Sequence, residues 1–430
     1  MISNKLGLVG KIIRNYSTST LVQKGKFQVN TVETIGSRLE QITNKYEYSD
    51  AIGVPDHHNF TLTFRDLNHN VKGLASGFVE SNMKPQEVVL TNLPQGSEYV
   101  ISQIASSKAG LKFVSLNPQY TFDQIGEQLK SSNAKTLIIG DNNQRIMIEE
   151  ARDYFPNLKT IRYSEYHRDS RFPALKYIYS TGTRQEPGID LLKDIVLDAD
   201  LLSKTKVSST DTATLVENGQ DLVAYTHSQL LNTGDSIIEL LDLKPNQRVS
   251  LSVPLYIGSS FPFYLGCLTN GLYIGITSNV NSNTDILNTI AKDKCSILYV
   301  TPKTLEEITR SVDLSKFDLS TLKTLVVSGV PNQQILKEFE EKVKCSSVVL
   351  HYVDGQPSQL SGLCFNSQGV GRLLPNLEAK VVDSKGQVVQ RGESGILQTK
   401  GFHVNNNNKS EWLDTKLNVK MNSDGTFTRI

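Results

Sequence analysis

Residues 211–230 read DTATLVENGQDLVAYTHSQL and combine strand, turn and helix patterns in one stretch. Ala213–Val216 has the pattern of a short buried strand, and Ser228 is expected to be the N-cap of a helix with a leucine- and isoleucine-rich face. Between them lies the polar turn Glu217–Asp221. Such a turn can hold phosphate when it contains several glycines and a lysine. This turn has one glycine, no lysine and two carboxylates, so it should repel a triphosphate.

The stretch resembles the AMP-forming acyl-CoA synthetase family, which is also called the adenylate-forming family. In that family the strand begins Asp-x-Ala-x-Ile, runs into a glycine-rich loop that contains a lysine, and ends in Thr-His before a helix. Asp211 and Ala213 match the start of this pattern, and Thr226–His227 match its end. The loop between them is shorter than in the family and has a different sequence. The resemblance implies the family's fold with an altered phosphate-binding loop.

Alternating strand and helix patterns extend on both sides of this stretch and favour parallel βαβ units. Apolar residues at helical spacing predict a helix over residues 64–78, and apolar runs predict strands at Val88–Leu90 and Thr136–Ile139. The resemblance implies a further helix over Gln333–Val343. Within the family, the Asn117–Tyr120 segment looks most like the mitochondrial medium-chain acyl-CoA synthetases.

The resemblance covers residues 33–430 in the family's order. We therefore expect an α/β fold with two doubly wound βαβ subdomains and a small distorted β-barrel, and without the family's C-terminal lid domain. The expected boundaries are residues 1–32 for a mitochondrial transit peptide or disordered segment, 33–210 for the first α/β subdomain, 211–368 for the second, and 369–430 for the β-barrel.

The charge balance excludes some classes of partner. The 45 lysines and arginines offset 44 aspartates and glutamates, so neither nucleic acid nor a membrane surface is an expected partner. Residues 249–284 carry no charge, but prolines and polar residues interrupt them, so we expect no transmembrane segment. The four cysteines lie far apart without metal-ligand spacing, which predicts reduced core thiols of an intracellular protein and no metal site. They are Cys267, Cys295, Cys345 and Cys364.

Residues 1–32 differ from the rest of the chain because they contain basic but no acidic residues. Apolar residues on one helical face are followed by a run of hydroxyl residues, which is typical of a mitochondrial transit peptide. Arg14–Ser17 also resembles a matrix-processing site. We expect a location in the mitochondrial matrix, and the alternative is a disordered basic tail. The apolar face consists of Ile2, Leu6, Val9 and Ile13, and the hydroxyl run is Tyr16–Thr20.

Two residues are expected beside an acyl ligand. Residues 253–256 resemble the start of the family's Pro-Leu-Tyr-His segment next to the acyl pocket, although Ile257 stands where histidine is usual. The resemblance implies that Tyr256 and Phe261 bind a carboxylic acid or its acyl group.

The adenine site is expected after a strand over Leu325–Ser328. The resemblance places the backbone of Gly329 and Val330 against the base. A glycine also suits close approach of the backbone to a ligand on physical grounds, and the alternative is a plain turn glycine.

The family's Tyr-Gly-x-Thr-Glu segment corresponds to residues 352–356, in which Tyr352 is retained. In the family the Thr meets phosphate and the Glu holds the metal ion, and here Gly355 and Gln356 take their places. A neutral amide is a poor ligand for Mg²⁺. Leu417 stands where the family's ribose-binding Asp is expected, and leucine accepts no hydrogen bond. We expect a vestigial nucleotide pocket without a catalytic residue. Its residues are Gly329, Val330, Tyr352, Gly355 and Gln356.

Four parts of the family's adenylation site are therefore altered together: the glycine-rich loop, the Thr/Glu pair, the ribose Asp and the lid lysine. Loss of one preorganised donor commonly costs ~10²–10³ in rate. We expect a catalytically inactive, acyl-CoA synthetase-like protein of mitochondria that needs no cofactor and binds an acyl ligand or a mitochondrial protein partner. The alternative is an active carboxylate–CoA ligase that uses ATP, Mg²⁺ and CoA and forms an acyl adenylate. A third reading is a decayed gene copy that yields little folded protein.

Overall fold

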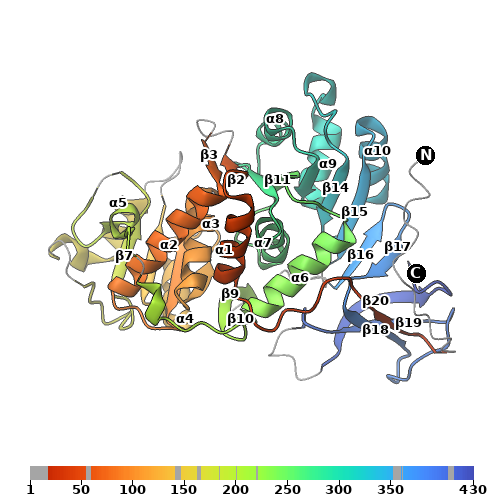
Figure 1. The fold of residues 1–430 in the computed structure, drawn as a ribbon, viewed down its shortest axis with the longest axis horizontal. Coiled ribbons are helices and arrows are strands. Elements are labelled where there is room, and N and C mark those ends of the chain that lie inside the picture. Colours follow the sequence, from red (N-terminus) through yellow and green to blue (C-terminus); the bar gives the residue numbers. More distant parts are fainter. Residues whose placement is uncertain are drawn as a thin grey trace.

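A computed structural model describes residues 18–430 apart from 55–59, 141–146, 162–165, 184, 200, 219–220, 352–359, 361 and 405–410. The described residues form an α/β fold with two mixed sheets and interspersed helices (Figure 1). The expected α/β class is therefore confirmed. Within the described residues, no helix combines the length and the apolar character that crossing a bilayer requires.

The smaller sheet has seven strands in the described part of the chain. Their order is β10 (Asp221–Thr226), β9 (Thr212–Asn218), β5 (Lys112–Ser115), β4 (Val88–Asn92), β6 (Thr136–Ile139), β7 (Tyr177–Ser180) and β8 (Asp190–Leu191). All neighbours pair parallel except β9 and β10. Successive side chains of a strand point to opposite faces, so Val89 joins one hydrophobic cluster while Val88 and Leu90 join another. The sheet is therefore buried on both faces.

The larger sheet has fourteen strands in the described residues. Their order is β1 (Thr20–Gln23), β18 (Leu377–Val382), β19 (Ser394–Lys400), β20 (Leu413–Met421), β21 (Phe427–Arg429), β17 (Val370–Leu373), β16 (Leu363–Asn366), β15 (Ser346–His351), β14 (Thr324–Ser328), β13 (Ile297–Val300), β11 (Arg248–Ser252), β12 (Tyr273–Ile276), β2 (Asp50–Val54) and β3 (Phe60–Thr63). Pairing is parallel from β15 to β2 and antiparallel towards β1. The antiparallel part contains the strands of residues 369–430, which were expected as a β-barrel, and also β1 and β16, which lie outside that range.

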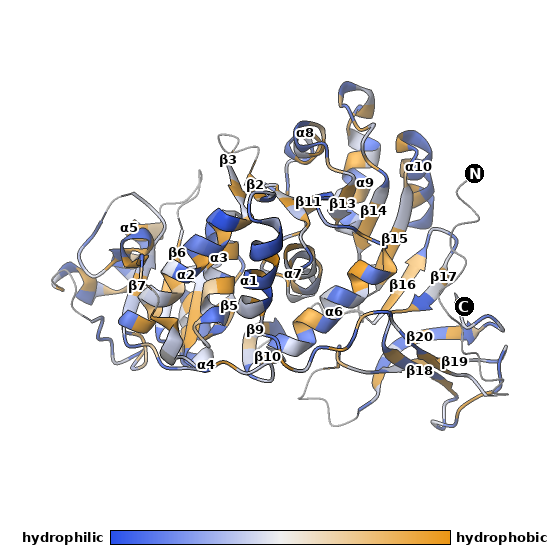
Figure 2. Ribbon diagram, in the orientation of Figure 1, coloured by the Kyte–Doolittle hydropathy of each residue, from blue (hydrophilic) through white to orange (hydrophobic). Residues whose placement is uncertain are grey.

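One layer of helices lies between the two sheets (Figure 1). It consists of α1 (Ile35–Tyr46), α2 (Phe64–Glu80), α3 (Ser97–Lys108), α6 (His227–Leu240) and α7 (Phe261–Thr269). The outer helices are α4 (Phe122–Ser132) and α5 (Met147–Tyr154) on the smaller sheet, and α8 (Asn283–Asp293), α9 (Pro302–Ser311) and α10 (Gln333–Val343) on the larger one. Hydrophobic and hydrophilic residues alternate along α6, as Figure 2 shows, because its two sides have different neighbours.

Helix α6 begins at His227, directly after Thr226 of the Thr-His pair. Thr226 is the N-cap: its Oγ1 accepts a hydrogen bond from the N–H of Gln229 at 3.2 Å, and Gln229 Oε1 accepts one from the N–H of Thr226 at 3.0 Å. The expectation that Ser228 caps this helix is therefore wrong. The glutamine three residues after Thr226 completes a reciprocal capping box that Ser228 lacks.

The strands of each sheet do not all come from the subdomain that the expected boundaries would give. β9 and β10 lie beyond residue 210 and yet belong to the smaller sheet, whereas β2 and β3 lie in the first 210 residues and belong to the larger one. Residues 18–32, expected to lie outside the fold, include β1, whose Thr20–Gln23 pair antiparallel with β18. The reason is that β1 supplies a hydrogen-bonded edge to β18, a long-range pairing that local sequence patterns do not reveal.

Residues 18–34 form a segment that we call the N-terminal strap. It runs from β18 across helix α6 to the start of α1. The carboxylate of Glu239 on α6 accepts hydrogen bonds from the backbone N–H groups of Lys26 and Phe27 at 2.8–3.1 Å. Asn232 exchanges two hydrogen bonds with the backbone of Asn30, at 2.6 and 2.9 Å. The strap therefore joins the antiparallel part of the larger sheet to the central helix layer.

Helices α6 and α7 approach each other at two glycines. A Cβ atom added to Gly234 would lie 2.7 Å from the carbonyl oxygen of Pro262 and 2.8 Å from the Cα atom of Gly266. Both neighbours are backbone atoms, which cannot rotate away. The contact therefore requires glycine on both helices.

Gly234→Ala should lower the free energy of unfolding. Overpacking a tight contact costs about 1–3 kcal/mol, which outweighs the roughly 1 kcal/mol that alanine gains over glycine inside a helix. Thermal and urea unfolding of the variant and the parent protein measure the difference. Gly96→Ala is the control, because an added Cβ there would meet only the Glu98 carboxylate at 3.4 Å. Equal stability of Gly234→Ala and the control would contradict the prediction.

Candidate functional site

The expected strand–turn–helix is a β-hairpin followed by a helix. β9 and β10 pair with Asn218 opposite Asp221, so two residues connect the strands. The expected order of strand, turn and helix therefore lacks one element, because the strand β10 lies between the turn and the helix. The reason is the period of two along β10, in which Val223 and Tyr225 are buried and the residue between them is half-buried.

The hairpin lies where parallel strands of both sheets end. β4, β5 and β9 are parallel, as are β11 and β12 in the larger sheet. The Gln95 side chain, after β4, reaches across to the larger sheet. Its Nε2 donates to the carbonyl oxygens of Leu251 at 3.4 Å and Thr277 at 3.1 Å, and its Oε1 accepts from the N–H of Leu255 at 3.1 Å. We call the edge at which these parallel strands have their carboxyl ends the carboxyl edge. It is the place where α/β folds commonly bind ligands.

A half-buried carboxylate occupies the end of β9. Burial raises the pKa of Glu217, and a hydrogen bond from Tyr120 lowers it by less. Burial and the Glu217 charge together raise the pKa values of Tyr120 and Tyr256. In the described part of the chain, no lysine or arginine forms an ion pair with Glu217. A half-buried carboxylate and two phenols therefore stand at this end of the hairpin.

Tyr256 lies in a segment that packs directly on the hairpin. A Cβ atom added to Gly258 would lie 2.3 Å from Cγ1 of Val216 on β9. The preceding Leu255 is held by its N–H, as described above, and by its carbonyl oxygen, which accepts a hydrogen bond from the Tyr99 hydroxyl at 2.8 Å. The structure therefore brings the expected acyl-site residue Tyr256 next to Glu217.

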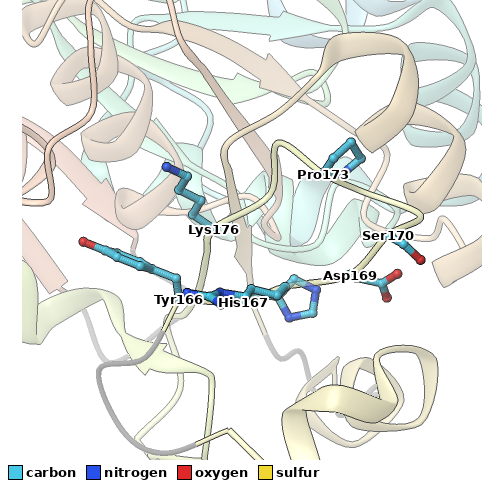
Figure 3. A pocket seen from close by; sticks show the side chains of 7 residues that line it. Tyr166, His167, Asp169, Ser170, Pro173 and Lys176 are labelled. Carbon is cyan, nitrogen blue, oxygen red and sulfur yellow. The ribbon is translucent and has the colours of Figure 1, made fainter.

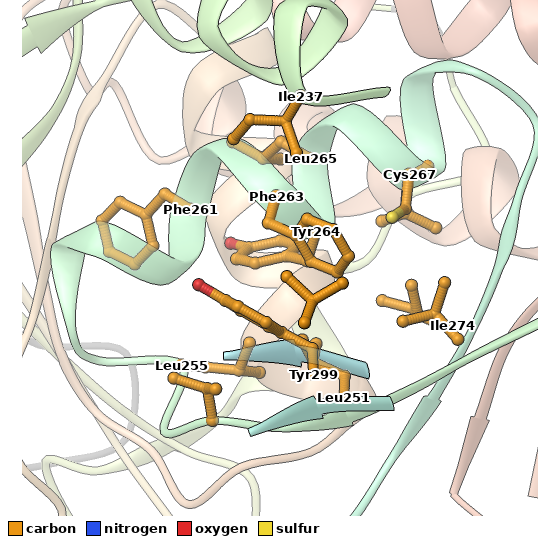
Figure 4. Packing of buried hydrophobic residues seen from close by; sticks show 14 of the residues in the cluster. Ile237, Leu251, Leu255, Phe261, Phe263, Tyr264, Leu265, Cys267, Ile274 and Tyr299 are labelled. Atoms are coloured by element: carbon orange, nitrogen blue, oxygen red, sulfur yellow. The ribbon is translucent and has the colours of Figure 1, made fainter. Parts of the chain in front are cut away.

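Phe261 has a different environment from Tyr256. It is 1% exposed and begins α7. Figure 4 shows it beside Tyr264, at a centroid distance of 6.2 Å, in a cluster where Phe263 and Tyr299 lie 4.3 Å apart. Phe261 is thus a packed core residue, while Tyr256 is half-buried at the carboxyl edge.

The residues expected around the adenine lie only partly within the described structure. Gly329 follows β14 with φ of +108°, a conformation that favours glycine, and its N–H donates to the carbonyl oxygen of Leu350 at 3.0 Å. Val330 is 38% exposed, which leaves this position accessible. The other three expected pocket residues, Tyr352, Gly355 and Gln356, lie outside the described residues.

Leu417 belongs to the hydrophobic core. It lies on β20, where every second residue is buried, and is 4% exposed. The position that the family resemblance assigns to a ribose-binding carboxylate therefore serves packing in this chain.

His227 is fully buried at the start of α6. Its Nδ1 accepts a hydrogen bond from the N–H of Ile35 at 3.3 Å, and its Nε2 has no partner within the described residues. Burial lowers its pKa to about 4, against the smaller opposite effect of the Asp211 charge. His227 is therefore neutral at physiological pH and joins α1 to α6.

The cysteines are core thiols, as expected. Cys267, Cys295 and Cys364 are buried, Cys345 is half-buried, and none forms a disulfide. Burial raises the pKa of Cys345 and Cys364 to about 12, so both are protonated and poor nucleophiles near neutral pH. Within the described residues, no three His, Cys, Asp or Glu side chains gather in a way that could hold a metal ion.

A family model described as "AMP-binding enzyme" matches residues 40–214 and 222–406. The chain belongs to the AMP-binding enzyme family. The match is interrupted at residues 215–221, which include the end of β9 and the tip of the hairpin.

Curated relatives in this family are distant. The Bacillus subtilis protein YngI is 26% identical over 396 residues, a match that covers 86% of this chain and 71% of YngI. The mitochondrial medium-chain acyl-CoA ligase ACSF2 of Macaca fascicularis is 25% identical over 403 residues, covering 86% of this chain and 64% of ACSF2. The chain thus spans about two thirds of these relatives.

Solved structures share the fold of this AMP-binding family member. The N-terminal domain of FACL13 from Mycobacterium tuberculosis aligns with a TM-score of 0.77 at 14% identity, covering 93% of this chain and 100% of that domain. The anthranilate CoA ligase AuaEII, solved with anthranoyl-AMP, aligns with a TM-score of 0.76 at 17% identity, covering 93% of this chain and 77% of AuaEII.

Sequence reasoning missed two residues of the site in this AMP-binding family member. Tyr120 contacts Glu217, and Gln95 ties the two sheets together. Tyr120 ends the Asn117–Tyr120 segment that follows β5, and its position after a buried strand of a parallel sheet is the signal that places it at the carboxyl edge. No local signal marks Gln95, because its partners belong to other strands.

The free energy of unfolding should decrease when the pH is lowered and His227 becomes protonated. Its pKa of about 4 lies below the ordinary 6.5, so the unfolded chain binds this proton more tightly. The contribution of neutral His227 is present above pH 6.5 and is lost as pH falls towards 4, which amounts to roughly 2–3 kcal/mol at 1.36 kcal/mol per pKa unit. Urea unfolding at pH 7 and pH 4.5 measures it.

His227→Asn is the matched variant, because the amide oxygen retains an acceptor for the N–H of Ile35 but does not titrate. Its stability should fall less between pH 7 and pH 4.5 than that of the parent protein. The buried His403, whose pKa is lowered to about 3, contributes equally to both proteins. An unchanged pH dependence in the variant would rule out His227 as the titrating group.

Proposed function

We propose that this chain is an acyl-CoA synthetase-like member of the AMP-binding family that forms no acyl adenylate. The observation that carries the proposal is the hairpin of β9 and β10. Asn218 pairs with Asp221, which leaves two connecting residues where the family has a long glycine-rich loop with a lysine. A phosphate cradle needs several backbone N–H groups that converge on one anion, together with positive charge.

The electrostatics of the hairpin support the same proposal. Phosphoryl transfer requires donors and cations that offset dense negative charge on the nucleotide. Glu217 instead places a half-buried carboxylate at this edge, with Asp221 on the exposed side of the hairpin. The family match is also interrupted over residues 215–221. The altered Gly355 and Gln356 positions add to this reasoning.

The retained activity is binding. The carboxyl edge keeps Tyr256 beside β9 and keeps a glycine with positive φ at Gly329, which are the positions assigned to an acyl ligand and to a nucleotide base. A carboxylic acid or acyl group, or a mitochondrial protein partner, would therefore be the ligand, with no cofactor. An active ATP-dependent carboxylate–CoA ligase is the second candidate. The intact order of the family's segments over residues 40–406 favours it.

Calorimetric titration with ATP·Mg²⁺ and with a non-hydrolysable acyl-adenylate analogue distinguishes the two candidates. Residues 18–430, which contain the strap, should give no binding heat and no thermal stabilisation at millimolar ligand. Micromolar affinity at that concentration would instead add about 4 kcal/mol to the free energy of unfolding. Such binding, or formation of acyl-CoA with ATP and CoA present, would establish the ligase.

The variant Glu217→Gln distinguishes the effect of the Glu217 charge on nucleotide binding from the effect of the short hairpin connection. If the short hairpin prevents phosphate binding, this variant should also give no binding heat with ATP·Mg²⁺. Binding that appears only in Glu217→Gln would show that charge repulsion alone excludes the nucleotide. A single cooperative melting transition of the purified protein serves as the control for folding, and its absence would favour the decayed gene copy.

We also propose that the protein acts in the mitochondrial matrix. The support is the basic, acid-free and hydroxyl-rich pattern of residues 1–32. Cleavage near the Arg14–Ser17 segment, before Thr18, would leave every contact of the N-terminal strap in place. The sequence feature and the strap are therefore compatible.

A fusion of residues 1–32 to a fluorescent reporter should enter mitochondria and lose its first residues on import. Amphipathic presequences depend on their positive charges, so Lys11→Gln combined with Arg14→Gln should reduce import. Microscopy and the size of the imported reporter measure both effects. The substitution of Ser3 by Ala is the neutral control. A reporter that stays in the cytosol would refute the proposed location.

A further inference from the structure

A cavity of about 460 Å³ lies in the loop that precedes β7. Ligand pockets typically have volumes of about 300–1,000 Å³, and this pocket, which is open to solvent, falls within that range. Figure 3 shows side chains of this loop arranged around the cavity. The lining residues are Tyr166, His167, Arg168, Asp169, Ser170, Pro173 and Lys176.

The cavity is remote from the carboxyl edge. β7 lies near one end of the smaller sheet, and β9 lies near the other end with β5, β4 and β6 between them. The residues that line the cavity play no part in the hairpin or in the segment around Tyr256. A ligand of this cavity would therefore act independently of the proposed acyl site.

The walls of the cavity are fixed by hydrogen bonds and aromatic contacts. The N–H of His167 donates to the carbonyl oxygen of Lys176 at 2.8 Å, which closes the loop. Asp169 forms an ion pair with Arg171 at 2.6 Å, and the guanidinium of Arg171 lies over the rings of Tyr154 and Phe172. The loop is thus preorganised, which lowers the entropic cost of binding.

His167 is a buried polar side chain without a partner. It is 3% exposed and packs edge-on against Phe155 at a centroid distance of 5.0 Å. Neither ring nitrogen has a hydrogen-bond partner within the described residues. A buried polar group without a partner costs free energy that a ligand can recover. A neutral imidazole offers one N–H donor and one acceptor.

The rim of the cavity carries excess positive charge. Arg168 and Lys176 are exposed, and neither forms an ion pair in the described part of the chain. The one carboxylate of the lining, Asp169, is already neutralised by Arg171, which lies outside the lining. Within the described residues no carboxylate therefore neutralises these two cations, although Lys176 Nζ also lies 5.9 Å from the centroid of the Tyr166 ring.

We propose that this cavity binds the phosphate group of a small molecule. The oxygens of a phosphate would accept hydrogen bonds from Arg168 and Lys176 at the rim and from the imidazole N–H of His167 in the wall. The Ser170 hydroxyl is a further donor on the same loop. Phosphate suits this set of donors because it presents several acceptor oxygens and a double negative charge.

Titration of the full chain with inorganic phosphate, pyrophosphate and AMP tests the proposal, with binding followed by calorimetry. At least one of the three should bind the parent protein. The Arg168→Gln/Lys176→Gln double variant should bind about tenfold or more weakly, because each hydrogen bond to a charged group is worth roughly a factor of ten or more. His167→Phe should also weaken binding while it retains the aromatic packing on Phe155.

Lys159→Gln is the matched control, because this exposed lysine carries the same charge outside the cavity. The dissociation constant of this variant should stay within about twofold of that of the parent protein, because a charge outside the cavity acts on the ligand only through salt-screened solvent. An equal loss of binding in the control and in the pocket variants would show non-specific charge attraction and overturn the proposal. The absence of binding of all three ligands at about 10 mM, roughly tenfold above a dissociation constant of about 1 mM, would overturn it too.

Discussion

The architecture depends on one shared layer of helices that must bury both of its sides. α6 and α7 meet at Gly234 and Gly266, where the two backbones approach more closely than any side chain would allow. A second contact joins the sheets directly, because the Gln95 side chain binds backbone groups of both β11 and the segment after it. The parallel strands of each sheet end at the carboxyl edge, and the Gln95 hydrogen bonds join the two sheets there. The core therefore determines where a ligand site can form.

The sequence predicted elements whose information is local. Helix α10 was expected over Gln333–Val343 and has these bounds, because its apolar residues keep one face and Asn332 caps it. Strand β6 was expected at Thr136–Ile139 for a similar reason, since it is a short apolar run buried on both faces. The α/β class follows from such elements in alternation. Family resemblance then supplied the order of the segments.

Local patterns did not reveal long-range pairing or the composition of the site. The pairing of β1 with β18 and the placement of β2 beside β12 join segments hundreds of residues apart. The group around Glu217 depends on three segments that meet only in the folded protein, so Tyr120 was missed. The turn was expected to end at Asp221, and no strand was expected after it, although Leu222 to Tyr225 are apolar and alternate in burial. At such positions, packing in the folded protein outweighs the local preference of the residues for strand or turn.

The strap also has a consequence for how the chain acquires its fold. Its β1 pairs with β18, more than 350 residues later, as shown by Thr20 opposite Lys380. The strap is therefore synthesised well before its partner strand, which follows it by more than 350 residues. Loop closure over such a distance is slow, and exposed edges stay open until it occurs. The edge of β18 that β1 covers therefore stays unpaired until this long-range pairing forms, and an unpaired strand edge can pair with another chain during folding.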